Sequence, residues 1–251
     1  DEMNYVPNMY ASALAHNRSY NFHCLMPRHE SEAYWEEVEQ GQLKCCETRR
    51  DLNVNIKIHY YKRKDEVTFT EQYEKILADT PDGVIIVPSR LEMTRKFTDQ
   101  LHERNIPFIM LDSYMPDLRP LAFYGQDSFA SGYFARKDYT ARLEKFFSDN
   151  SDIHHCITLN SKAHLVGEFL LKSNRRNIQI MGYDMVEKNA ECLRQGSISF
   201  LIAQHGYMQG YYSVDALARA IILKKVVNPV NYMPIEILTK ENVDFYRRTM
   251  I

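Results

Sequence analysis

The chain has 251 residues, of which 45% are hydrophobic and 25% are charged, and its formal net charge is −2. This composition is typical of a globular protein with one large core or two modest ones. It excludes a membrane-spanning helix, since no apolar run approaches the roughly 18–20 residues required, and it argues against a free-standing DNA-binding domain, which carries a basic surplus.

In chain order, short apolar runs alternate with amphipathic stretches. The first half predicts strands at 20–25, 54–60, 84–87, 108–111 and 122–124, with helices at 34–48, 71–78, 91–104 and 127 to about 136. The second half predicts helices at 139–148, 162–173, 186–194 and 207–223, with strands at 156–159, 179–182, 198–203 and 233–238. Alternating βα units imply parallel sheets covered by helices on both faces, so we expect an α/β fold of two doubly wound lobes.

The sequence shows no residue pattern typical of catalysis or of metal binding. The five cysteines form an odd set without metal-like spacing, which indicates buried or half-buried thiols in a reducing compartment: Cys24, Cys45, Cys46, Cys156 and Cys192. The histidines also lack metal-ligand spacing, and neither a GxSxG nor a GxGxxG motif follows the first strand. We therefore expect no metal, no cofactor, no enzymatic activity and a cytoplasmic location.

Polar side chains follow several predicted strands at their carboxyl ends, where ligands bind in open parallel sheets. They are Arg28, His29 and Glu32 after the first strand, then Ser89 and Arg90, then Asn160, Asp184 and Gln204, with Tyr34 and the single tryptophan Trp35 beside them. Bidentate polar groups together with an aromatic face are typical of polyol recognition. Two alternatives stay open, because Ser89, Asn160 and Asp184 could cap the helices that follow them and Trp35 could lie in the core.

The first residues suggest a separate element. Pro7 holds Val6 in an extended conformation, and Asn8 is suited to cap a short helix through Leu14. The alternative is an ordinary capped turn.

Several segments together carry a family resemblance. They are 4–8 with Ala11 and Leu14, 83–89, 105–112, 126–127 with Gly132, 180–184, and 202–204 with Met208 and Gly210. In these segments the chain resembles the effector-binding domain of LacI-family transcription regulators, which is similar to the type I periplasmic sugar-binding proteins. The resemblance implies a homodimer that binds a small carbohydrate or sugar derivative between its lobes and thereby changes its affinity for operator DNA.

The resemblance also implies roles for individual residues. The expected ligand contacts are Arg28, Glu32, Tyr34, Trp35, Arg90, Asn160, Tyr183, Asp184 and Gln204, and the expected DNA-hinge residues are Asn8, Ala11 and Leu14, joined to a headpiece absent from this chain. Arg28 and Glu32 replace smaller polar residues common in the family, which leaves the ligand open between a plain sugar and a derivative. The rival function is a solute-binding protein for sugar uptake with the same fold.

The resemblance also divides the chain into domains. It implies a headpiece-and-hinge remnant at 1–18, an N-terminal lobe at 19–137 and 206–231, and a C-terminal lobe at 138–205 and 232–251. Between 137 and 138 it skips a block that holds a strand, a helix and a further strand in the family, and that carries a ligand-clamping arginine in many relatives. A βαβ unit takes about 30 residues or more. We favour omission of residues from the sequence over a true deletion, because deletion would expose a sheet edge.

Overall fold

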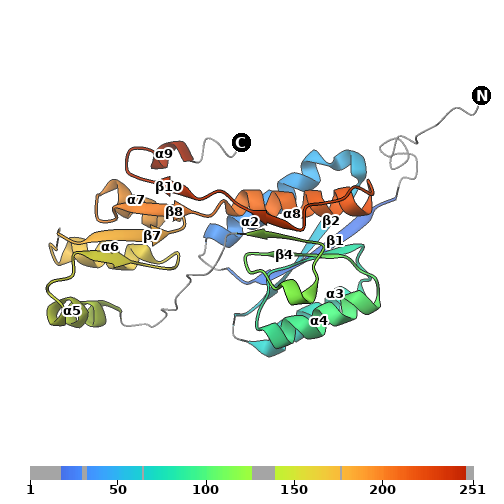
Figure 1. Cartoon of the computed structure of the whole chain (residues 1–251), viewed down its shortest axis with the longest axis horizontal. Helices are drawn as coiled ribbons and strands as arrows, with labels where there is room; N and C mark the ends of the chain where they lie inside the picture. The colour runs from blue at the N-terminus through green and yellow to red at the C-terminus, as the bar shows by residue number, and fades with distance from the viewer. Residues whose placement is uncertain (1–17, 30–32, 64, 126–138, 176, 247–251) are drawn as a thin grey trace, which may run out of the picture. The chain divides into compact units, whose positions relative to one another are not determined.

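The computed structural model describes residues 18–29, 33–63, 65–125, 139–175 and 177–246 (Figure 1). These residues form two compact units. Those of unit 1 fall within Asp1–Glu30, Trp35–Asp127 and Gly206–Met233, and those of unit 2 fall within Ser31–Tyr34, Ser128–His205 and Pro234–Ile251. No helix of the described residues is long and apolar enough to cross a membrane.

Unit 1 is built on a six-stranded sheet in the order β2-β1-β3-β4-β5-β9. The strands are β1 (Tyr20–Pro27), β2 (Val54–Tyr61), β3 (Gly83–Ile86), β4 (Phe108–Leu111), β5 (Ala122–Gly125) and β9 (Val230–Tyr232). All five pairings are parallel. The short β9 was not predicted, because Val-Asn-Tyr forms no apolar run.

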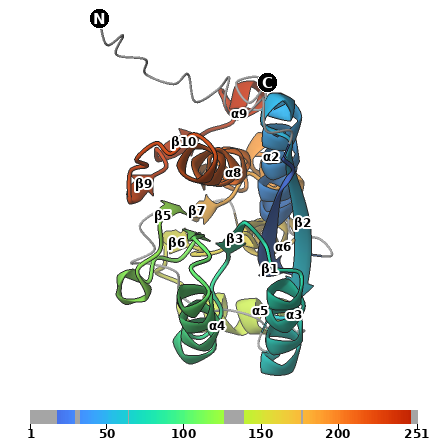
Figure 2. The ribbon, with the colours of Figure 1, turned by 90° about the vertical axis from the view of Figure 1, so that its right-hand side faces the viewer.

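Helices cover both faces of this sheet, as Figure 2 shows, with α3 (Glu66–Ala78) and α4 (Leu91–Glu103) on one side and α2 (Ala33–Thr48) and α8 (Gly206–Ile221) on the other. Short 3-10 turns lie at Arg50–Leu52 and Pro116–Leu118. Under α3 and α4, Phe69, Tyr73 and Phe97 pack against strand residues in one buried cluster. The helix α3 starts five residues before the predicted position, because the Asp65 side chain accepts a hydrogen bond from the Thr68 amide and caps it.

Two glycines allow α2 and α8 to touch backbone to backbone. A Cβ atom on Gly210 would lie 1.9 Å from the carbonyl oxygen of Val38, and one on Gly41 would lie 1.9 Å from the carbonyl oxygen of Tyr207. Neither position can hold a side chain without separating the helices. The pair therefore determines how closely α8 approaches α2.

Unit 2 is built on a four-stranded sheet in the order β10-β8-β7-β6. Its elements are the helices α5 (Tyr139–Asp149), α6 (Ala163–Lys172), α7 (Glu187–Arg194) and α9 (Val243–Tyr246), and the strands β6 (His155–Ile157), β7 (Gln179–Tyr183), β8 (Phe200–Ala203) and β10 (Glu236–Leu238). The core joins Phe147, Phe169, Ile180, Leu193 and Leu201.

The α/β fold with helix-covered parallel sheets is confirmed, with one correction. β10 pairs with β8 in the antiparallel direction. β10 follows β9 of the unit 1 sheet with no helix between them, so β10 is not the second strand of a βαβ unit, the connection that makes neighbouring strands parallel. The helix predicted from 127 to about 136 and the 137/138 junction lie outside the described residues, so the missing block stays a prediction.

Candidate functional site

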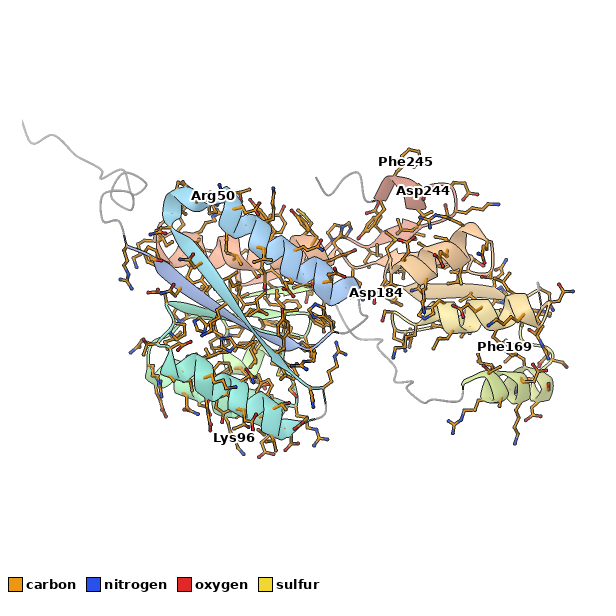
Figure 3. All side chains as sticks on the ribbon, turned by 180° about the vertical axis from the view of Figure 1, so that it is seen from behind. Arg50, Lys96, Phe169, Asp184, Asp244 and Phe245 are labelled. Atoms are coloured by element: carbon orange, nitrogen blue, oxygen red, sulfur yellow. The ribbon has the colours of Figure 1, made fainter. Side chains whose placement is uncertain are left out.

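Asp184 and Gln204, both predicted to follow the carboxyl ends of strands, lie together at the carboxyl edge of the unit 2 sheet. Asp184, labelled in Figure 3, directly follows β7, and Gln204 directly follows β8. The Gln204 amide nitrogen donates to Asp184 Oδ1. Asp184 is 8% exposed and has a left-handed φ of 67°. Its amide donates to the Ile202 carbonyl at 2.9 Å, which anchors the turn to the neighbouring strand.

A residue absent from our predictions, Asn189 of α7, holds this edge in place. Its side chain is completely buried. Nδ2 donates to the carbonyl oxygens of Ser161, Tyr183 and Asp184 at 3.0–3.1 Å, and Oδ1 accepts from the His164 amide at 2.8 Å. One side chain thus connects the loops that follow β6 and β7. The sequence could have identified Asn189, because an asparagine on the apolar face of a predicted helix needs hydrogen-bond partners inside the protein.

The capping alternatives give different results at the three positions. Val186 occupies the N-cap position of α7, so Asp184 is not the N-cap residue of that helix. Arg90, rather than Ser89, occupies the N-cap position of α4. Asn160 does serve a local turn, because its Oδ1 accepts from the Lys162 amide at 2.9 Å. Asn160 and Tyr183 are both half-buried.

Asp112 in unit 1 has the same backbone geometry as Asp184. It directly follows β4, has a φ of 67°, and its amide donates to the Tyr124 carbonyl of β5 at 3.0 Å. Each unit therefore places an aspartate on a left-handed turn at the carboxyl end of a parallel strand. Asp112 was missed as a candidate although it follows the apolar run 108–111, which is the signal that identified Asp184.

The aromatic candidates in the first turn of α2 are enclosed. Tyr34 is 8% exposed and Trp35 is 2% exposed. The guanidinium carbon of Arg63 lies 5.3 Å from the centroid of the Trp35 ring, a cation–π contact that covers the ring. A sugar would reach this face of Trp35 only after Arg63 had moved, so the core alternative for Trp35 stays open.

The other candidates of unit 1 follow the carboxyl ends of its strands. Arg28 and Arg90 are exposed, and Arg90 donates to Glu66 at 2.7 Å. His29 Nε2 lies 3.3 Å from the Glu39 carboxylate, which also accepts from the Tyr60 hydroxyl at 2.8 Å. Glu32 and the three hinge residues, Asn8, Ala11 and Leu14, lie outside the described residues.

A family model described as periplasmic binding protein domain matches the chain over residues 23–141 and 137–225. The chain belongs to this family. The two matched segments meet close to the junction at which we expect a missing block. Among curated protein sequences, none matches the chain.

Solved structures share the fold over almost the whole chain. A provisionally assigned LacI transcriptional regulator from Bacteroides fragilis has a TM-score of 0.85 and 32% identity, covering 91% of this chain and 100% of its own. GanP, a glucose-galactose binding protein from Geobacillus stearothermophilus, has a TM-score of 0.78 and 16% identity, covering 90% and 99%. A solute-binding protein from Bacillus halodurans C-125 with bound myo-inositol has a TM-score of 0.75 and 14% identity, covering 92% and 98%.

Proposed function

We propose that this protein is a ligand-responsive transcription regulator whose effector domain binds a small carbohydrate or sugar derivative. The observation that carries the proposal is the likeness to the Bacteroides fragilis protein, which combines 32% identity with a TM-score of 0.85. The two solute-binding proteins compared above share only 16% and 14% identity. Identity at that level supports a common fold without a common role.

The proposed contacts of the effector are polar groups that follow the carboxyl ends of the sheet strands. Asp184, held by Gln204 and Asn189, is the principal acceptor for sugar hydroxyls, and Asp112 is its counterpart in unit 1. A carboxylate accepting hydroxyl groups forms charge-assisted hydrogen bonds, which are stronger than neutral ones. The remaining proposed contacts are Arg28, Glu32, Tyr34, Trp35, Arg90, Asn160 and Tyr183.

In this proposal the effector shifts the population of conformations in a cytoplasmic homodimer, and this changes its affinity for operator DNA. Asn8, Ala11 and Leu14 form the hinge to a DNA-binding headpiece. Two-fold symmetric proteins suit pseudo-palindromic operators.

A role without catalysis agrees with the chemistry of the thiols. Burial raises the pKa of all five cysteines, to about 12 for Cys24 and about 11 for Cys46. A reactive cysteine needs the opposite shift, so these thiols are not activated nucleophiles.

Two measurements test the proposal. A thermal-shift screen with mono- and disaccharides, uronates and phosphosugars should identify a stabilising effector, because a ligand that binds the folded state raises its stability. The complete gene product should then bind DNA from upstream of its own gene, with an affinity that this effector changes. Effector binding without DNA binding, in a reading frame that opens with a secretion signal, would favour the solute-binding alternative.

A further inference from the structure

Two histidines and an aspartate meet at the β2 edge of the unit 1 sheet, where both histidines lie within strands rather than in the loops that follow them. In the parallel β1–β2 pair, His23 lies opposite Lys57, and Leu25 lies opposite His59. Residues two apart on a strand share a face, and Leu25 packs in the cluster under α3. The two histidines therefore lie on the α3 side of the sheet, and Asp79 is the C-cap residue of α3.

The nitrogen and oxygen atoms of these three side chains that could ligate a metal lie close enough together to bind one ion. His59 Nε2 lies 3.1 Å from His23 Nδ1, and one ligand atom from each of His23, His59 and Asp79 lies within 4.8 Å of the others. Two nitrogens bound tetrahedrally to one zinc ion at about 2.0–2.1 Å would lie roughly 3.4 Å apart. The observed separation needs to widen by only about 0.3 Å.

The surroundings also suit a cation. Both imidazoles are buried, with His23 4% exposed and His59 6% exposed, and burial lowers the pKa of each ring, which favours the neutral form that binds metal ions. Gln72 forms a hydrogen bond with His59, the kind of outer contact that orients a metal-binding ring. The Lys57 ammonium lies 2.6 Å from the Asp79 carboxylate at the exposed end of the cluster, so a cation already occupies that position.

We propose that His23, His59 and Asp79 bind a divalent transition-metal ion of the zinc type, which displaces the Lys57 ammonium from Asp79. The three side chains supply two nitrogens and one oxygen, and a fourth position remains open to water. The ion joins the edge strand β2 to β1 and to the end of α3. Binding therefore stabilises unit 1 by mass action.

The test is zinc titration of the purified, tag-free chain after treatment with EDTA, followed by calorimetry and thermal melting. We expect one zinc ion per chain and a rise in the melting temperature of the wild type. His59→Gln and Asp79→Asn should each weaken zinc binding by at least about tenfold, since even outer-shell partners of metal sites contribute about 10–100-fold. Cobalt(II) should show the visible absorption of a tetrahedral complex with the wild type only.

Two further variants separate this site from adventitious binding. His155→Gln removes an exposed histidine of β6 in unit 2 and should leave zinc affinity unchanged. Lys57→Met should strengthen zinc binding, because it removes the competing ammonium, and both Lys57 and Asp79 are exposed enough for the fold to tolerate substitution. The proposal is overturned if the wild type binds no zinc at micromolar concentration, or if folded His59→Gln and Asp79→Asn proteins bind zinc as the wild type does.

Discussion

Substitution of Gly210 by alanine tests the helix packing that positions α8. The added Cβ would lie 1.9 Å from the Val38 carbonyl oxygen, 2.7 Å from the Val38 carbonyl carbon and 3.0 Å from its Cα. All three neighbours are backbone atoms of α2, so no side-chain rotation can relieve the contact. Since a carbon and a carbonyl oxygen approach to about 3.3 Å at closest, the helices must separate by roughly 1.4 Å.

The cost follows from two opposing effects. Overpacking costs about 1–3 kcal/mol, and a clash with backbone belongs at the upper end of this range. Alanine is better than glycine in a helix interior by about 1 kcal/mol. We therefore expect Gly210→Ala to lower the stability of unit 1 by about 2 kcal/mol, which is about 4–8 °C in melting temperature for a unit of this size.

Thermal denaturation followed by circular dichroism measures the effect, with Gly167→Ala as the matched helical control. At Gly167 in α6, a Cβ would meet Ser197 Oγ at 3.1 Å, Cys192 Sγ at 3.2 Å and Cys192 Cβ at 3.3 Å, and none of these is a backbone atom. The control should melt within a few degrees of the wild type. A Gly210→Ala protein as stable as the wild type would refute the close approach of α8 to α2.

Three other outcomes are expected. The Asp184→Asn protein should keep the melting temperature of the wild type, because asparagine tolerates the left-handed turn. Its affinity for the effector found in the screen, measured by calorimetry, should fall by about 10–150-fold through loss of charge-assisted hydrogen bonds. Unchanged affinity would remove Asp184 from the site. Asn189→Leu should lower the free energy of unfolding of unit 2, measured with denaturant, by about 2–4 kcal/mol, since it leaves several buried groups without partners. A loss below about 1 kcal/mol would contradict the role of Asn189. Burial lowers the pKa of His59 from 6.5 to about 4. The free energy of unfolding of the EDTA-treated protein should therefore be highest above pH 6.5 and fall as the pH drops toward 4, because over this range the unfolded state binds the proton and the folded state does not. An equally steep fall in His59→Gln would assign the effect to other groups.

The sequence by itself determined the alternation of strands and helices and the neighbourhood of Asp184 and Gln204. Apolar periodicity distinguishes buried from exposed faces along each element. The carboxyl ends of parallel strands share one edge, so polar residues that follow β7 and β8 had to lie near each other. Both inferences depend only on local pattern and on the rules of parallel sheets.

Only the tertiary structure decided which buried faces meet and at what distance. His23 and His59 are 36 residues apart in the chain, and the register of β1 against β2 brings their rings together. The bonds of Asn189 to two separate loops, and the contact of Gly210 with the backbone of Val38, likewise depend on the docking of whole elements. A periodic pattern shows that a residue faces inward, but the identity of its neighbour depends on the packing of elements distant in sequence.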